Sequence, residues 1–179
     1  MTKVLYLLRH AKAAWAEPGM QDIDRPLNGR GRQACALVAG YLRQAGLPDQ
    51  VLCSAARRTR ETLDLVAAAL DWTPPVAHAD RLYLASPPTL LQHIRKATGT
   101  RLMVVGHNPG IEELAGDLAG SGDRAALERL QAKYPTAGLA VLSFPVDDWS
   151  KVVPRGGRLE AFVTPALLAE APATAKASG

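Results

Sequence analysis

The sequence predicts an α/β fold, with a mainly parallel sheet flanked by helices on both faces and a hairpin-like C-terminal extension. Short apolar runs alternate with segments of helical periodicity over most of the chain, as in strands joined by crossover helices. Near the C-terminus, two strand-like runs follow each other with no helical pattern between them. The 179 residues suit one core, so a single domain is expected over residues 1–165.

The first half of the chain contains two predicted strand–helix units. Residues 3–8 (KVLYLL) form a continuous apolar strand of the kind buried on both faces of a parallel sheet. After a polar loop with proline and glycine, residues 32–46 carry apolar side chains at helical spacing and end at a glycine. Residues 49–54 (DQVLCS) predict a second strand, and residues 56–70 predict a helix with one apolar face.

The next part of the chain contains two further units. Residues 76–78 predict a short strand, and a helix follows from Pro87 or Pro88 to about residue 97. Residues 101–106 (RLMVVG) form the clearest strand after the first, with a helix beyond it to about residue 119. Asn108 is a suitable N-cap for that helix, and Pro109 suits its first position.

The last third is expected to extend the sheet. Residues 139–144 (LAVLSF) and 158–163 (RLEAFV) are strand-like, and the segment between them, VDDWSKVVPRGG, has no helical pattern. The chain is therefore expected to return as a hairpin. Residues 166–179 form an alanine-rich tail that is expected to make a helical turn and then fray.

The composition argues against several classes of protein. No apolar run approaches the roughly 18 residues of a membrane-spanning helix, and the N-terminus lacks signal-peptide features, so a cytoplasmic location without membrane association is expected. The two cysteines form no CxxC pair and the four histidines have no metal-binding spacing, so no metal site is expected. A net charge of +4 weakly favours anionic partners, whereas an aromatic fraction of 5% argues against nucleic acid.

Polar side chains suited to an anion follow three of the predicted strands. They are Arg9 and His10 after the first strand, Ser54 and several arginines after the second, and His107 and Asn108 after residues 101–106. In open α/β sheets, ligands bind outside the carboxyl ends of the strands, where these side chains would meet. The free N–H groups at the start of the helix after Asn108 also suit an anion. A solvated basic surface is the alternative explanation for the arginines.

Three motifs in this order resemble those of the histidine phosphatase superfamily, also called the phosphoglycerate mutase-like or RHG family. The matching residues are Arg9-His10-Ala11, then Ser54, Arg58 and Thr62 in SAARRTRET, and finally His107 in VVGHNPGIEEL. Together the motifs span roughly residues 3–163. The small size and the DRPLNGRG loop, in which Arg25 precedes a proline and a leucine, are similar to the SixA type, the phosphohistidine phosphatases of bacteria.

The resemblance implies a mechanism that the residue types can support. His10 would attack phosphorus through one ring nitrogen while the other donates to a backbone carbonyl. Arg9, Arg58 and Arg25 would hold the phosphoryl oxygens, and His107 would donate a hydrogen bond to the transferring group. Water would then hydrolyse the phosphohistidine intermediate. Because arginine supplies the positive charge, neither a cofactor nor a metal is expected.

Two departures from the family pattern are informative. Ala11 replaces the glycine of the name-giving motif, and its single methyl is expected to tighten the turn without loss of the site. Members that act on phosphate esters usually carry an acid after the third strand, which protonates the leaving oxygen. Here that segment reads ADRLYLASPPTLL, and its carboxylate, Asp80, lies too early to fit. The SixA type is similar in lacking this acid. An imidazole leaves phosphorus more readily than an alkoxide, so phosphohistidine is favoured over a sugar phosphate.

Alternative roles remain open for several of these side chains. Arg57 and Arg60 compete with Arg58 for the phosphate-binding position on its helix, although Arg57 is expected to be a solvated neighbour. Arg25 can instead form a surface ion pair with Asp22 or Asp24. Ser54 suits a helix N-cap as well as a phosphate ligand.

The expected activity is removal of phosphate from phosphohistidine on a protein, such as a phosphotransfer domain, through a phospho-His10 intermediate. A small domain with a short loop over its site would leave an open pocket that suits a macromolecule. One alternative is a phosphatase of a small phosphate monoester that uses the same nucleophile. The other is a non-catalytic module that binds anions, which would not need both histidines.

Overall fold

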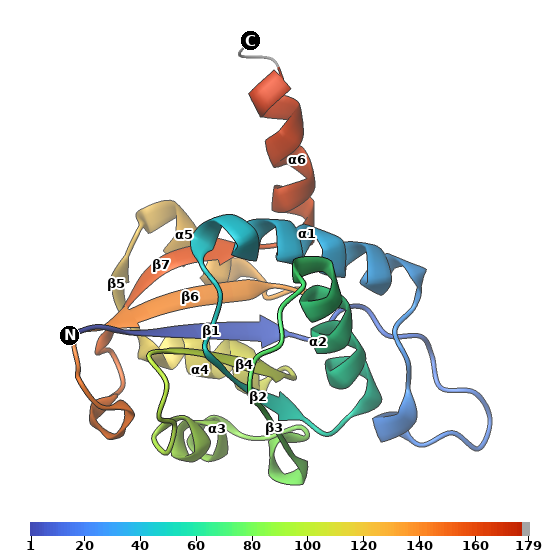
Figure 1. The fold of residues 1–179 in the computed structure, drawn as a ribbon, viewed down its shortest axis with the longest axis horizontal. Helices are drawn as coiled ribbons and strands as arrows, with labels where there is room; N and C mark the ends of the chain where they lie inside the picture. Colours follow the sequence, from blue (N-terminus) through green and yellow to red (C-terminus); the bar gives the residue numbers. More distant parts are fainter. Residues whose placement is uncertain (177–179) are drawn as a thin grey trace.

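The computed structural model describes the backbone of residues 1–176 and the side chains of residues 1–170. A seven-stranded sheet in the order β3-β2-β4-β1-β6-β7-β5 forms its centre (Figure 1). The strands are β1 (Lys3–Arg9), β2 (Gln50–Ser54), β3 (Val76–Ala79), β4 (Arg101–Gly106), β5 (Ala119–Gly122), β6 (Leu139–Phe144) and β7 (Gly157–Val163). The helices are α1 (Gly29–Ala45), α2 (Arg57–Leu70), α3 (Pro87–Ile94), α4 (Gly110–Leu118), α5 (Arg124–Ala132) and α6 (Pro165–Lys176). Three short 3-10 segments are η1 (Asp22–Asp24), η2 (Asp80–Leu82) and η3 (Trp149–Lys151).

The sheet brings the predicted anion-binding strand ends to one edge. Strands β3, β2, β4 and β1 are parallel, so their carboxyl ends lie on the same side. Arg9 at the end of β1 lies opposite Gly106 at the end of β4. Strand β6 is antiparallel to both β1 and β7, which confirms the α/β fold with its hairpin-like C-terminal extension.

Strand β1 shows why the first apolar run is continuous. Leu5 and Leu7 belong to the core on one face of the sheet, with side chains of α3, α4 and α5. Tyr6 and Leu8 belong to the core on the other face, with side chains of α1 and α2. All four are fully buried, and burial of each leucine side chain contributes about 1.5–3 kcal/mol. A strand covered on both faces needs apolar residues at every position.

The structure corrects the start of the helix after β4 and adds two elements that were not expected. Helix α4 begins at Gly110 with Pro109 at the N-cap position, because the side-chain amide of Asn108 is turned toward the carbonyl of Tyr134. Strand β5 (AGSG) has no apolar side-chain pattern, so periodicity does not reveal it. Helix α5 does carry a local signal, because Asp123 caps it by accepting from the N–H of Ala126.

Helix α6 is longer than the single turn expected for the alanine-rich tail. It begins at Pro165, and Leu167 and Leu168 pack against the core on the α1 face of the sheet. Residues 177–179, the end of the expected tail, lie outside the described residues. Across the described part of the chain, no helix combines the length and the apolar character needed to span a membrane.

Candidate active site

Four of the predicted side chains meet at the carboxyl edge of the parallel strands. His10 follows β1, Ser54 ends β2, His107 follows β4, and Arg58 lies in the first turn of α2. All four are buried, and the rings of His10 and His107 have their centroids 5.4 Å apart. Residues separated by about a hundred positions in sequence thus form one cluster, which is called the catalytic cluster below after the role that we propose for it.

The imidazole of His10 has one ring nitrogen committed to the backbone. Its Nδ1 lies 2.7 Å from the carbonyl oxygen of Ala11, which can only accept, so Nδ1 carries the hydrogen. The lone pair therefore lies on Nε2. The backbone N–H of His10 donates to the carbonyl of Gly106 at 3.0 Å, which ties the residue to the end of β4. His10 thus has the tautomer that a nucleophile needs.

The turn after His10 accepts alanine in place of glycine. Ala11 is fully buried, and its φ is not in the left-handed region that favours glycine. Its N–H donates to Oγ1 of Thr62 at 2.9 Å, and that hydroxyl donates to the carbonyl of Arg58 at 2.7 Å. Thr62, which belongs to the second motif, thus connects the His10 turn to α2.

Arg58, rather than its neighbour, enters the cluster. Its side chain is 4% exposed and donates to the carbonyl oxygen of Asp22 at 2.7 Å and to Oδ2 of Asp22 at 3.0 Å. One terminal nitrogen also lies 3.3 Å from Nδ1 of His107. Arg57 points away and forms an exposed ion pair with Glu61 at 2.8 Å. The register of α2 thus separates the two arginines.

His107 has partners at both ring nitrogens. Its Nε2 lies 2.7 Å from the hydroxyl oxygen of Ser54. Because Arg58 can only donate to Nδ1, Nε2 carries the hydrogen and donates to Ser54. A hydroxyl can also donate, so rotation of the Ser54 hydroxyl would allow the tautomer with a hydrogen on Nδ1. Ser54 is not the N-cap of α2, because Ala56 occupies that position.

Arg9 lies beside the cluster, and only part of its guanidinium is hydrogen-bonded to described residues. It donates to the carbonyl of Tyr134 at 2.9 Å, which fixes one arm of the guanidinium. Its Nε is buried and has no hydrogen-bond partner among the described residues. A buried donor left without a partner is costly to the folded state.

Comparison with known proteins identifies the superfamily of this chain. The family model for the histidine phosphatase superfamily (branch 1) matches residues 5–83, which contain the first two motifs. A crystal structure described as a candidate phosphohistidine phosphatase SixA from Agrobacterium tumefaciens is 34% identical, with a TM-score of 0.77, over 91% of this chain and 98% of that chain. This chain belongs to the histidine phosphatase superfamily.

Two further similar proteins extend over the same region. A structure from Nakamurella multipartitia, also described as a candidate SixA, is 29% identical with a TM-score of 0.79, over 92% of this chain and 97% of that chain. An uncharacterized protein of Mycobacterium tuberculosis is 43% identical over 164 residues, which are 88% of this chain and 99% of that protein. The superfamily likeness thus includes the C-terminal half, which the family model does not match.

In this member of the superfamily, Arg25 reaches the cluster through an aspartate. Its guanidinium pairs with Oδ1 of Asp22 at 3.1 Å and donates to the carbonyl of Ala14 at 2.9 Å. This is the ion pair that was considered as the alternative for Arg25. The structure also places Asp22 on Arg58, so one carboxylate joins both arginines.

Asp22 and Tyr83 are site residues that sequence reasoning missed. The hydroxyl of Tyr83 donates to Oδ2 of Asp22, and the Tyr83 ring meets the ring of His107 edge-on, with centroids 5.4 Å apart. Tyr83 lies in the segment searched for an acid, and Asp22 lies three residues before Arg25. Their contact joins η1 to the segment after η2, and no sequence pattern marks such a contact.

Asn108 turns away from the histidines. Its side-chain nitrogen donates to the carbonyl of Tyr134 at 3.0 Å and contacts Glu112 at 3.4 Å. Arg9 donates to the same carbonyl, so Tyr134, a residue that the motifs do not include, positions both side chains. Asn108 and Arg9 therefore share one backbone acceptor, and the side-chain nitrogen of Asn108 is already engaged.

Electrostatics keep both histidines neutral. Burial, followed by the charges of Arg58 and Arg9, lowers the pKa of His10 to about 4. Burial, followed by His10 and Arg58, lowers the pKa of His107 to about 3. The hydrogen bond from Tyr83, followed by those from Arg25 and Arg58, lowers the pKa of Asp22 to about 2. At neutral pH the site thus holds two neutral imidazoles, cationic arginines and one ionised carboxylate.

Proposed function

We propose that this chain removes phosphate from phosphohistidine on a protein, through a covalent phospho-His10 intermediate. Membership of the superfamily supports phosphatase chemistry. The ionised state of Asp22 is the observation that favours phosphohistidine over a phosphate ester as the substrate. This carboxylate contacts the catalytic cluster, but its low pKa and its bonds to Arg25 and Arg58 keep it ionised. It therefore has no proton to give to the leaving oxygen of a phosphate ester.

The first step transfers the phosphoryl group to His10. The lone pair on Nε2 attacks phosphorus, the P–N bond of the substrate breaks, and the substrate imidazole takes the electron pair. Arg9 and Arg58 stabilise the charge that develops on the phosphoryl oxygens. His107 donates a hydrogen bond from Nδ1 to the same group in the tautomer in which its ring proton has exchanged through water from Nε2 to Nδ1 and the Ser54 hydroxyl donates to Nε2.

The second step releases phosphate. Water attacks phosphorus, the bond from phosphorus to Nε2 breaks, and His10 recovers its lone pair while both protons of the water leave with the phosphate as dihydrogen phosphate. Transfer between two imidazoles is close to balanced in energy, so the first step needs no acid. This agrees with the state of Asp22, the described carboxylate that contacts Arg58, because Asp22 is ionised.

The test compares three substrates with matched variants. These are a protein bearing phosphohistidine, a small phosphoramidate and a small alkyl phosphate, each assayed with wild type, His10→Ala and His93→Ala. His93 is the control, because its ring is bound to the carbonyl of Thr89 within α3. We expect the wild type and His93→Ala to turn over both P–N substrates and to turn over little of the ester. We expect His10→Ala to lose turnover of both P–N substrates.

Other outcomes would contradict the proposal in distinct ways. Comparable turnover of the alkyl ester would show that an acid reaches the leaving group, with Glu112 and Asp22 as the first residues to replace. Turnover that survives His10→Ala would exclude His10 as nucleophile. Mass spectrometry after an alkaline quench should find the trapped phosphate on the peptide that contains His10.

A further inference from the structure

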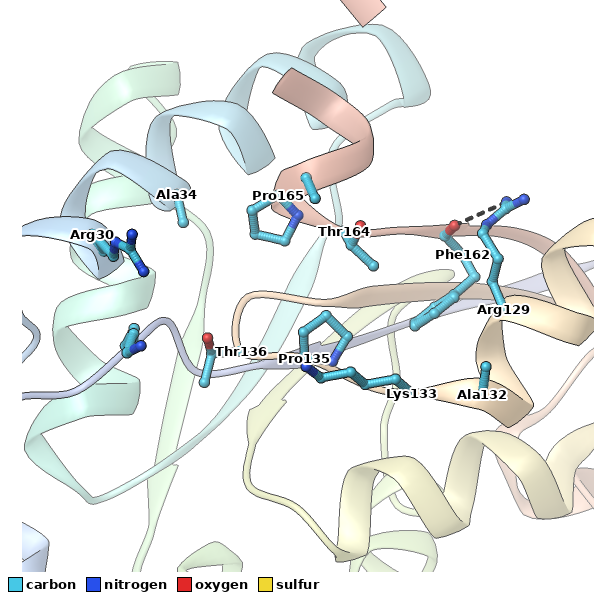
Figure 2. A pocket seen from close by; sticks show the side chains of 12 residues that line it. Arg30, Ala34, Arg129, Ala132, Lys133, Pro135, Thr136, Phe162, Thr164 and Pro165 are labelled. Atoms are coloured by element: carbon cyan, nitrogen blue, oxygen red, sulfur yellow. Dashed lines mark hydrogen bonds between the residues drawn. The ribbon is translucent and has the colours of Figure 1, made fainter. Parts of the chain in front are cut away.

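A basic pocket lies beside the catalytic cluster. It has a volume of about 550 Å³ and lies between the start of α1, the end of α5 and the junction of β7 with α6 (Figure 2). Its basic lining residues are Lys12, Arg30, Arg129 and Lys133. Its apolar lining residues are Ala34, Ala132, Pro135, Phe162, Pro165 and Ala166. No carboxylate is among the described residues that line it.

The four basic side chains of the pocket are not compensated by acidic ones. All four are exposed, and none takes part in an ion pair with a described residue. Arg129 donates to the carbonyl of Phe162 at 3.2 Å, which ties its guanidinium to the end of β7. Like charges gathered around an apolar floor repel one another, so this arrangement favours an anionic partner with apolar groups.

The pocket is lined in part by residues of the backbone segments next to His10. Lys12 is two residues beyond His10, so their Cα atoms are at most about 7 Å apart. On the opposite wall, Pro135 and Thr136 precede Ala137, whose N–H donates to the carbonyl of His10 at 2.9 Å. A molecule bound at His10 and large enough to extend sideways would therefore reach this pocket.

We propose that the pocket binds an acidic segment of the phosphohistidine-bearing protein substrate, next to the phosphohistidine bound at His10. This inference rests on the proposed function and names the surface that recognises the substrate. A protein segment offers carboxylates for Lys12, Arg30, Arg129 and Lys133 together with apolar side chains for the floor. The basic side chains stand exposed at the rim, which suits the surface of a protein better than an enclosed small anion.

The experiment reverses charge on two walls of the pocket. Arg30→Glu with Lys133→Glu changes residues from α1 and from the end of α5, and neither side chain has a hydrogen-bond partner among the described residues. The control is Lys96→Glu with Arg158→Glu, which changes the net charge equally near the opposite edge of the sheet. For each protein, kcat/KM is measured with the phosphoprotein and with a small phosphoramidate. Chemical denaturation confirms that both double variants are folded.

We expect the pocket variant to lower kcat/KM for the phosphoprotein by about tenfold or more relative to the small phosphoramidate. The control should change this ratio less than twofold. Two outcomes would overturn the docking inference while the proposed function stands. One is an equal ratio of kcat/KM for the phosphoprotein to kcat/KM for the phosphoramidate in the two double variants. The other is an equal loss of kcat/KM for both substrates in the pocket variant. Absence of phosphoprotein turnover by the wild type would overturn the proposed function, and the docking inference with it.

Discussion

The catalytic cluster and the basic pocket both contain basic side chains, and these side chains differ in how they are held. Arg58 in the catalytic cluster is buried and bound by Asp22 and His107. Arg30 and Lys133 in the basic pocket are exposed and have no ion-pair partner among the described residues. A fixed guanidinium suits the charge of a transition state, because it needs no reorganisation during the reaction. Exposed cations without ion-pair partners suit attraction and docking of a larger anion.

The largest expected effect separates a buried arginine from its exposed neighbour. Arg58→Ala should lower kcat/KM for a small phosphoramidate by about 10²–10³, because it removes a positioned donor from the cluster. Arg57→Ala removes an exposed side chain paired with Glu61, and should change kcat/KM less than twofold. Steady-state kinetics on both variants provide the measurement. Similar losses of kcat/KM in the two variants would show that burial of Arg58 in the cluster does not set its contribution to turnover.

Stability should fall with acidification because the cluster holds its histidines neutral. The pKa values of His10 and His107 lie at about 4 and about 3 in the folded protein, below the unfolded value of about 6.5. Between pH 6.5 and 4 the unfolded chain binds more protons, so the free energy of unfolding decreases as pH falls. His10 alone should account for roughly 2–3 kcal/mol of this loss.

Chemical denaturation at several pH values between 7 and 4 tests this expectation. His10→Gln has no titrating ring, so its stability should decrease less than that of the wild type over this range. Parallel curves for the two proteins would mean that the pKa of His10 is not lowered by folding.

A smaller effect is expected at the residue that supports His107. Ser54→Ala removes the partner of Nε2 in a buried position, which should lower the free energy of unfolding by about 1–3 kcal/mol. It should also reduce kcat/KM about tenfold, because His107 loses the hydroxyl that orients its ring. Ser121→Ala, at an exposed position in β5, is the matched control and should stay within about 0.5 kcal/mol of wild type. Equal stability in the two variants would contradict the role of this hydrogen bond.

The smallest expected effect is that of salt. Raising the ionic strength above about 0.15 M shortens the Debye length below about 8 Å, which screens exposed charges more than buried ones. The KM for the phosphoprotein should therefore rise by a few-fold, and more than the KM for a small phosphoramidate. Equal salt dependence for both substrates would place the attraction at the catalytic cluster rather than at the basic pocket.

Much of the architecture and the main motif positions could be predicted from the sequence. The apolar run of β1 and the GH at the end of β4 are local patterns, and parallel strands bring their carboxyl ends to one edge. The position four residues after Ser54 in the family motif favoured Arg58 over Arg57, and the structure shows the two pointing apart. Strand β5 was missed because AGSG has no apolar pattern, and its pairing with β7 depends on neighbours far along the chain.

The sequence by itself determined the alternation of strands and helices, the family motifs and the absence of a suitably placed acid after the third strand. Only the tertiary structure decided that Asp22 reaches Arg58 and Arg25, that Tyr83 closes this contact, and that four cations surround one pocket. The first set consists of short-range patterns, which the backbone imposes within a few residues. The second set consists of side-chain contacts between segments brought together by packing, and these depend on the whole fold.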